Sequence, residues 1–73
     1  MSKLEEWMKK NRVSYRQAQE LAKVDFTTIY KVVNPKLNYQ PTFNTLKRLE
    51  RMTDGEVTLL EMLQDIKEVQ NAI

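Results

Sequence analysis

The spacing of apolar residues along the chain predicts a series of helices, each with one buried face. Apolar residues recur at three- and four-residue intervals, which is the period of a helix that packs one side against a core. We expect helices to begin near residues 3, 15, 26, 43 and 59, with the third ending near residue 33 and the last near residue 71. The positions expected to be buried are Leu4, Trp7, Met8, Ala18, Ala22, Val24, Ile29, Val32, Phe43, Leu46, Leu49 and Met52.

Short polar motifs mark where these helices begin and end. A Ser or Thr followed three residues later by Glu or Gln forms a capping box, in which both side chains satisfy free backbone N–H groups. This motif begins at Ser2, Ser14 and Thr58. Asp25 and Thr42 are the expected N-caps of the third and fourth helices. Gly55 is expected to take positive φ after the fourth helix.

Residues 14–34 contain two short helices joined by a tight turn. Ala18 and Ala22 lie on one face of the first and are small enough for the second to cross closely over it. The buried side of the second leaves aromatic, hydroxyl and ammonium groups facing outward, a combination suited to base edges in the major groove. The residues assigned to base contact are Phe26, Thr27, Thr28, Tyr30 and Lys31. Two alternatives stay open: Phe26 folds back under the turn, and Thr28 contacts a phosphate.

This stretch resembles the helix-turn-helix of the phage Cro and repressor family of DNA-binding proteins. The resemblance continues through residues 40–49, QPTFNTLKRL, which are similar to the family's P-S-x-x-T-L-x-x-L helix, and through residues 57–63, VTLLEML, which are similar to its V-S-L-D-E-L-L segment. It covers roughly residues 4–63. The fold that it implies is all-α: one compact five-helix domain of the lambda-repressor type over residues 1–73, with the helix-turn-helix formed by helices 2 and 3.

Two positions depart from the family pattern. Gln19 stands where the family carries a very small residue, and Lys23 stands where its turn carries Gly. A non-glycine residue with positive φ costs roughly 1 kcal/mol. Lys23 is therefore either strained or part of a turn that differs from the family's.

We assign phosphate contacts to residues around the third helix. Backbone N–H groups at a helix N-terminus attract anions, and such contacts fix the register of a helix in the groove. Matching residues of the family also contact phosphates. The assigned residues are Tyr15, Arg16, Gln17, Lys36, Asn38, Tyr39, Thr42 and Asn44. For the start of the second helix, a solvated helix end is the alternative.

The last predicted helix, within residues 58–73, carries more apolar side chains than one core can cover. The surplus on an acidic helix indicates a symmetric contact between two copies. The residues assigned to this dimer interface are Leu60, Met62, Ile66, Val69 and Ile73. The alternative is a tail that wraps the monomer or frays.

Composition excludes several classes of function. The chain has no Cys, no His and one Gly, which leaves no thiolate metal site, no imidazole base and no glycine-rich phosphate loop. We therefore expect no catalytic residues, no metal, no cofactor, no small-molecule ligand and no enzymatic activity. No apolar run approaches the length of a membrane span, so no membrane partner is expected, and we expect a cytoplasmic or nucleoid-associated protein.

The charge distribution is uneven. Residues 1–53 hold 11 Lys and Arg against 5 Asp and Glu, whereas residues 54–73 hold one Lys against 5 acidic residues. A basic body with an acidic end suits a phosphate-facing surface and a distal tail. Together with this distribution, the resemblance implies a sequence-specific transcription regulator from a phage or prophage, binding a two-fold double-stranded DNA operator as a homodimer. The alternative is an antitoxin-type helix-turn-helix protein whose C-terminal helix binds a protein partner.

Overall fold

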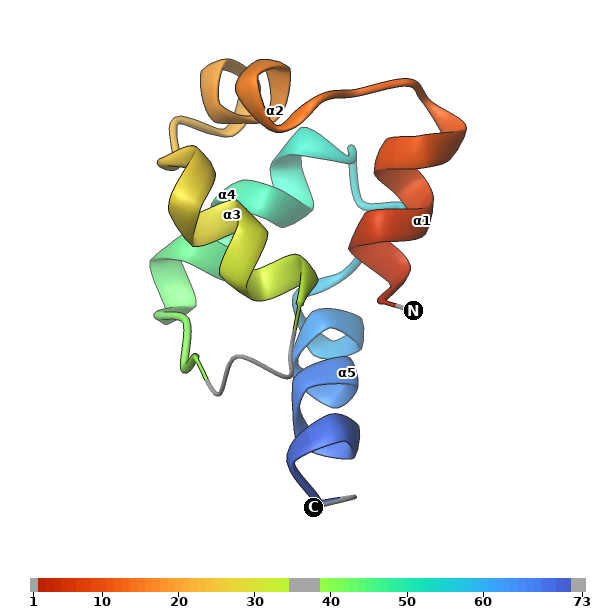
Figure 1. The fold of residues 1–73 in the computed structure, drawn as a ribbon, viewed down its shortest axis with the longest axis vertical. Coiled ribbons are helices and arrows are strands. Elements are labelled where there is room, and N and C mark those ends of the chain that lie inside the picture. Colours follow the sequence, from red (N-terminus) through yellow and green to blue (C-terminus); the bar gives the residue numbers. More distant parts are fainter. Residues whose placement is uncertain (1, 35–38, 72–73) are drawn as a thin grey trace.

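The computed structural model describes residues 2–34 and 39–71, with side chains described as far as Glu68, and all regular structure in these residues is helical (Figure 1). The all-α prediction is confirmed, and each helix lies within one or two residues of its expected bounds. None of the described helices is long and apolar enough to cross a membrane. The helices are α1 (Lys3–Lys10), α2 (Tyr15–Ala22), α3 (Phe26–Val33), α4 (Phe43–Met52) and α5 (Leu59–Asn71).

Local capping explains where four of these helices begin. The Ser2 hydroxyl accepts the N–H of residue 5, and the Thr42 hydroxyl accepts the N–H of residue 45. At Ser14 both halves of the capping box are present, because the Gln17 side chain also accepts the Ser14 N–H. Thr58 forms the same reciprocal pair with the side chain three residues later. These bonds satisfy donors that a helix leaves unpaired, so the short polar motifs set the starts.

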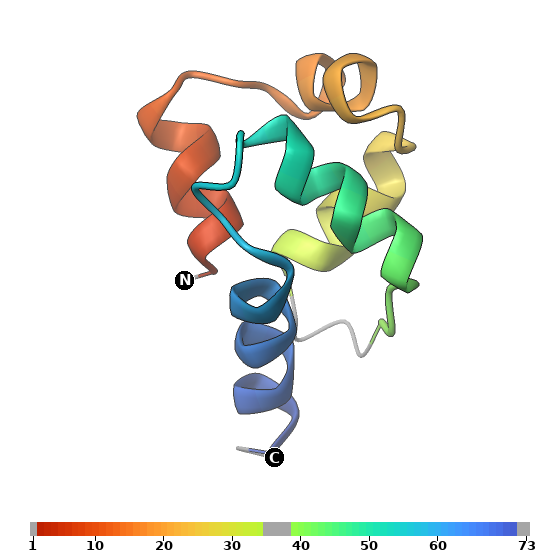
Figure 2. The same ribbon diagram turned by 180° about the vertical axis from the view of Figure 1, so that it is seen from behind.

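The core draws on every helix. α2 packs against α3 and α4, and α5 packs against α1 and α4. In both ribbon views α5 points away from the body that the other helices form (Figures 1 and 2). The Cα radius of gyration is 11.0 Å, close to the value of about 11 Å expected for a compact chain of this length. The buried apolar residues are Leu4, Met8, Ala18, Ala22, Val24, Ile29, Val32, Val33, Leu46, Leu49, Val57, Met62 and Ile66.

Phe43 is the clear error in the predicted core. Its side chain is 64% exposed, whereas Leu46 and Leu49 on the same helix are buried. Phe43 is the first residue of α4, one turn before the buried part of that face begins. The ammonium group of Lys47 lies 5.8 Å from the centre of its ring. Helical spacing predicted the correct face but not how far along α4 that face is covered.

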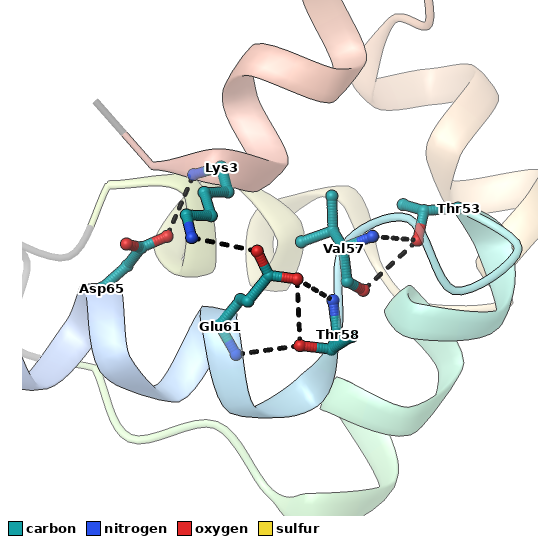
Figure 3. Close-up of polar contacts among 6 residues, drawn as sticks. All are labelled: Lys3, Thr53, Val57, Thr58, Glu61 and Asp65. Carbon is teal, nitrogen blue, oxygen red and sulfur yellow. Dashed lines mark hydrogen bonds and ion pairs between the residues drawn. The ribbon is translucent and has the colours of Figure 1, made fainter.

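The turn after α4 is built around Thr53, which is 1% exposed. Its hydroxyl donates to the carbonyl oxygen of Glu50 at 2.9 Å. The same hydroxyl oxygen accepts the N–H of Val57 (Figure 3). Asp54 and Gly55 both have positive φ, at 56° and 82°. The prediction for Gly55 is therefore confirmed. The buried Thr53 hydroxyl fixes the path from α4 to α5 by pairing backbone groups that the turn leaves free.

An ionic contact ties the start of α1 to α5 (Figure 3). The Lys3 ammonium lies 3.0 Å from Glu61 Oε2, and the Lys3 backbone N–H donates to Asp65 Oδ2. Glu61 Oε1 also accepts the N–H and the hydroxyl of Thr58. The Lys3 ammonium, followed by the Thr58 donors, lowers the pKa of Glu61, and the Glu61 carboxylate in turn raises the pKa of Lys3. The acidic α5 is thus held by the N-terminus of the basic body.

This contact makes the stability of the fold depend on pH. A carboxyl whose pKa is lowered by folding stabilises the fold above its unfolded pKa and loses that contribution as pH falls below about 4. We expect Glu61→Gln to have a lower urea midpoint than wild type at pH 7, and a midpoint close to that of wild type at pH 3. Glu20→Gln is the control, because it changes an exposed carboxylate outside this contact. Its urea midpoint should differ between pH 7 and pH 3 by the same amount as in wild type. Equal pH dependence in wild type and Glu61→Gln would contradict the assignment.

Lys23 adopts the left-handed conformation, with φ 59° and ψ 38°, at the end of α2. Of the two alternatives for this turn, strain at Lys23 is the correct one. We expect Lys23→Gly to raise the free energy of unfolding by about 1 kcal/mol, because glycine adopts positive φ without a Cβ clash. Chemical denaturation measures this change. Lys23→Ala is the matched control, since it removes the charge and keeps the strain; a similar gain in Lys23→Ala would show that charge and not backbone strain is responsible.

Candidate nucleic-acid interface

The surface of interest is formed by α3 together with the start of α2. Only the residues 23–25 separate the two helices, and Val24 in this turn is buried. Ala18 and Ala22 of α2 are 0% and 4% exposed, as expected for small residues where two helices cross. On α3, Ile29 and Val32 are buried, which leaves the opposite side of the helix facing outward.

The residues assigned to base contact share that outer side. Phe26 is 53% exposed and Tyr30 is 48% exposed. Thr27 and Lys31 are exposed as well, and Thr28 is half-buried. The alternative in which Phe26 folds back under the turn is excluded by its exposure. The outer side of α3 therefore presents two aromatic rings, two hydroxyls and one ammonium group.

Gln19 fixes the start of α3. Its side-chain oxygen accepts the backbone N–H of Phe26 at 2.9 Å, across seven positions of the chain. Asp25 stands at the N-cap position but makes no capping bond; it accepts the hydroxyl of Thr27 at 2.6 Å instead. The departure from the family at Gln19 thus supplies the cap that Asp25 does not. Sequence pattern missed this role, because a capping bond between two helices has no fixed spacing.

Two ring contacts join α3 to its neighbours. The rings of Tyr15 and Tyr30 meet edge to face, with centroids 5.8 Å apart. Partial burial is the main cause that raises the pKa of the Tyr15 phenol, so this hydroxyl stays a neutral donor at physiological pH. The Lys31 ammonium lies 5.4 Å from the centre of the Tyr39 ring. Three segments predicted to act together are therefore adjacent: the start of α2, α3, and the residues before α4.

The residues assigned to phosphate contact occupy the edges of this surface. Arg16 and Gln17 are exposed at the start of α2, and Thr42 and Asn44 are exposed at the start of α4. Tyr15 and Tyr39 are half-buried through their ring contacts. The Gln17 amide oxygen is engaged in the capping box, which leaves its NH₂ group as the donor. Lys36 and Asn38 lie outside the described residues.

This surface carries cationic side chains beside a hollow. None of the ion pairs formed by the described residues includes Arg16 or Lys31. A shallow hollow of about 630 Å³ separates the start of α2 from the start of α3, and it is lined by Arg16, Gln19 and Phe26 among others. Asp25 also lines this hollow, so its walls combine the Phe26 ring, the Arg16 guanidinium and one carboxylate.

The predicted dimer interface on α5 requires correction. Met62 and Ile66 are each 2% exposed, because they form the side of α5 that packs within the chain. They are not available to a second copy. Leu60 is 73% exposed and remains a candidate contact. Val69 and Ile73 lie outside the described side chains.

The described residues contain no group of three or more His, Cys, Asp or Glu side chains placed to hold a metal ion. Comparisons with protein-family models, with curated proteins and with solved structures gave no match to this chain.

Proposed function

We propose that this protein is a sequence-specific double-stranded DNA-binding regulator of the Cro and repressor type, in which α2 and α3 act as the helix-turn-helix. The observation that carries the proposal is the outer side of α3. Phe26, Tyr30 and Lys31 face outward there, on a helix whose other side is fully buried. The two aromatic rings lie one helical turn apart, and exposed apolar side chains that lie together mark a surface to which a partner binds.

The dimensions of α3 support insertion into the major groove. A helix with its side chains is about 10–12 Å in diameter, which matches the width of a major groove, about 12 Å, and the eight residues of α3 give a segment about 12 Å long to lie in it. Lys31 is a donor for guanine O6 and N7, and the threonines pair with either bases or phosphates. Arg16 at the start of α2, and Thr42 and Asn44 at the start of α4, then contact the phosphates on either side. Phosphate neutralisation supplies most of the affinity, and the side chains of α3 supply the specificity.

Dimerisation on a two-fold operator is part of the proposal. Leu60 on the outer side of α5 supports it, since its 73% exposure leaves an apolar side chain uncovered in one copy. Occupancy of the operator by two copies then blocks or contacts the transcription machinery. The same exposure of Leu60 favours a second candidate, an antitoxin-type protein in which α5 binds a different protein chain.

Selection of binding sites from a random duplex library at near-physiological salt tests the proposal. We expect enrichment of an inverted repeat whose half-sites lie about one helical turn apart, because two-fold protein symmetry imposes two-fold operator symmetry. An enriched single half-site would retain DNA binding and remove the dimer. Absence of any enriched sequence would overturn the proposal, and co-purification of a small partner chain would then support the antitoxin candidate.

A further inference from the structure

We propose that Phe26 makes the DNA surface a reader of the C5-methyl group of pyrimidines, both in thymine and in 5-methylcytosine. This inference rests on the proposed function and names the chemical group that α3 recognises. It assigns to Phe26 a preference that hydrogen-bonding side chains do not supply.

The chemistry of the groove limits what Phe26 is able to contact. Phenylalanine has no hydrogen-bond donor or acceptor, and its ring is 53% exposed at the first position of α3. The edges of base pairs in the major groove present donors, acceptors and one apolar group, the thymine C5-methyl. A phenylalanine ring that enters the groove therefore buries its exposed apolar area when it packs on that methyl group. Against any other base edge, the ring leaves polar atoms of the base without hydrogen-bond partners.

The surroundings of Phe26 hold its backbone in place before any ligand binds. Gln19 accepts its backbone N–H, so the first turn of α3 is fixed relative to α2. The Thr27 hydroxyl donates to Asp25 Oδ2, which adds a second bond at the start of α3. A backbone that is already ordered in the free protein loses little conformational entropy on binding.

Asp25 extends the inference to methylated cytosine. Its second carboxylate oxygen accepts no hydrogen bond from any described residue, and a carboxylate accepts the N4 amino group of cytosine. 5-Methylcytosine carries that amino group and the C5-methyl on one base. It therefore offers Phe26 the same methyl group as thymine, and offers Asp25 a donor where thymine has the O4 acceptor.

The test uses the operator obtained by selection, with each thymine replaced in turn by deoxyuridine, which lacks only the methyl group. We expect about a fourfold loss of affinity at one thymine position in each half-site, the equivalent of one buried methyl group. At that position 5-methylcytosine should bind more tightly than cytosine. In Phe26→Ala, thymine and deoxyuridine should bind equally well.

Phe43→Ala is the matched control. It removes a phenylalanine that is more exposed than Phe26 but lies at the start of α4. The control should keep the wild-type ratio between thymine and deoxyuridine, and circular dichroism should show both variants folded. Insensitivity of wild type to deoxyuridine at every position, or an unchanged ratio in Phe26→Ala, would overturn methyl reading while leaving DNA binding intact. Failure of the proposed function would differ, because no duplex would then be enriched.

Discussion

Replacing Ile29 with Ala is expected to lower the free energy of unfolding by about 2–5 kcal/mol. Ile29 is 0% exposed and lies on the buried side of α3, within the core to which all the helices contribute. Truncation removes three carbon atoms and leaves a cavity that packed neighbours do not fill completely. A 73-residue chain has a total stability of roughly 4–11 kcal/mol, so the loss is a large share of the whole.

Urea denaturation followed by far-ultraviolet circular dichroism measures this loss. Ile29→Val, which removes one carbon atom, should cost about 0.5–1.5 kcal/mol and calibrates the cavity effect at the same position. Thr27→Ala changes an exposed residue of the same helix and should cost less than either. A loss below about 1 kcal/mol in Ile29→Ala would mean that α3 is not anchored through this side chain.

Helix starts were predictable because the interactions that create them are local. A capping bond joins residues three apart, so Ser14 and Gln17 identify the start of α2 from sequence alone. The buried sides of α2 and α3 followed from spacing for the same reason. Positive φ at Gly55 was also a local prediction, since the end of a helix imposes it.

Errors arose where the answer depended on packing between helices. Phe43 has the helical spacing of a core residue, but it is the first residue of α4 and its side chain is exposed, whereas Leu46 three residues later is buried. On α5 the sequence offers apolar residues on more than one side, and only the fold selects Met62 and Ile66 as the buried pair. The cap from Gln19 to Phe26 was missed because it joins two helices.

The candidate site was predicted more completely than the α5 surface. The described residues assigned to DNA contact are all exposed or half-buried. They belong to the start of α2, to α3 and to residues 39–44. The structure adds the contacts between these residues. The ring contact between Tyr15 and Tyr30 couples α2 to α3, and the Lys31 ammonium near the Tyr39 ring couples α3 to the segment before α4.

Lys31→Ala is expected to weaken operator binding by about 1–3 kcal/mol and to relax preference at one base pair. The Lys31 ammonium is exposed on α3 and pairs with no carboxylate among the described residues, so it is available to a guanine edge. Binding of the wild-type and variant proteins to the operator and to all three substitutions at each position measures the effect. The loss of discrimination between base pairs should be confined to the operator position that Lys31 contacts.

Arg16→Ala should give the opposite pattern, because Arg16 is assigned to a phosphate at the start of α2. Removing a phosphate contact weakens binding to every sequence alike and reduces the slope of log affinity against log salt by about one. Lys67→Ala, which removes an exposed cation from α5, is the control and should change neither quantity. The two roles are distinct only if the variants separate in this way. Equal losses on every duplex in Lys31→Ala and Arg16→Ala would mean that Lys31 contacts the backbone, and base recognition would then depend on Phe26, Tyr30 and the threonines of α3.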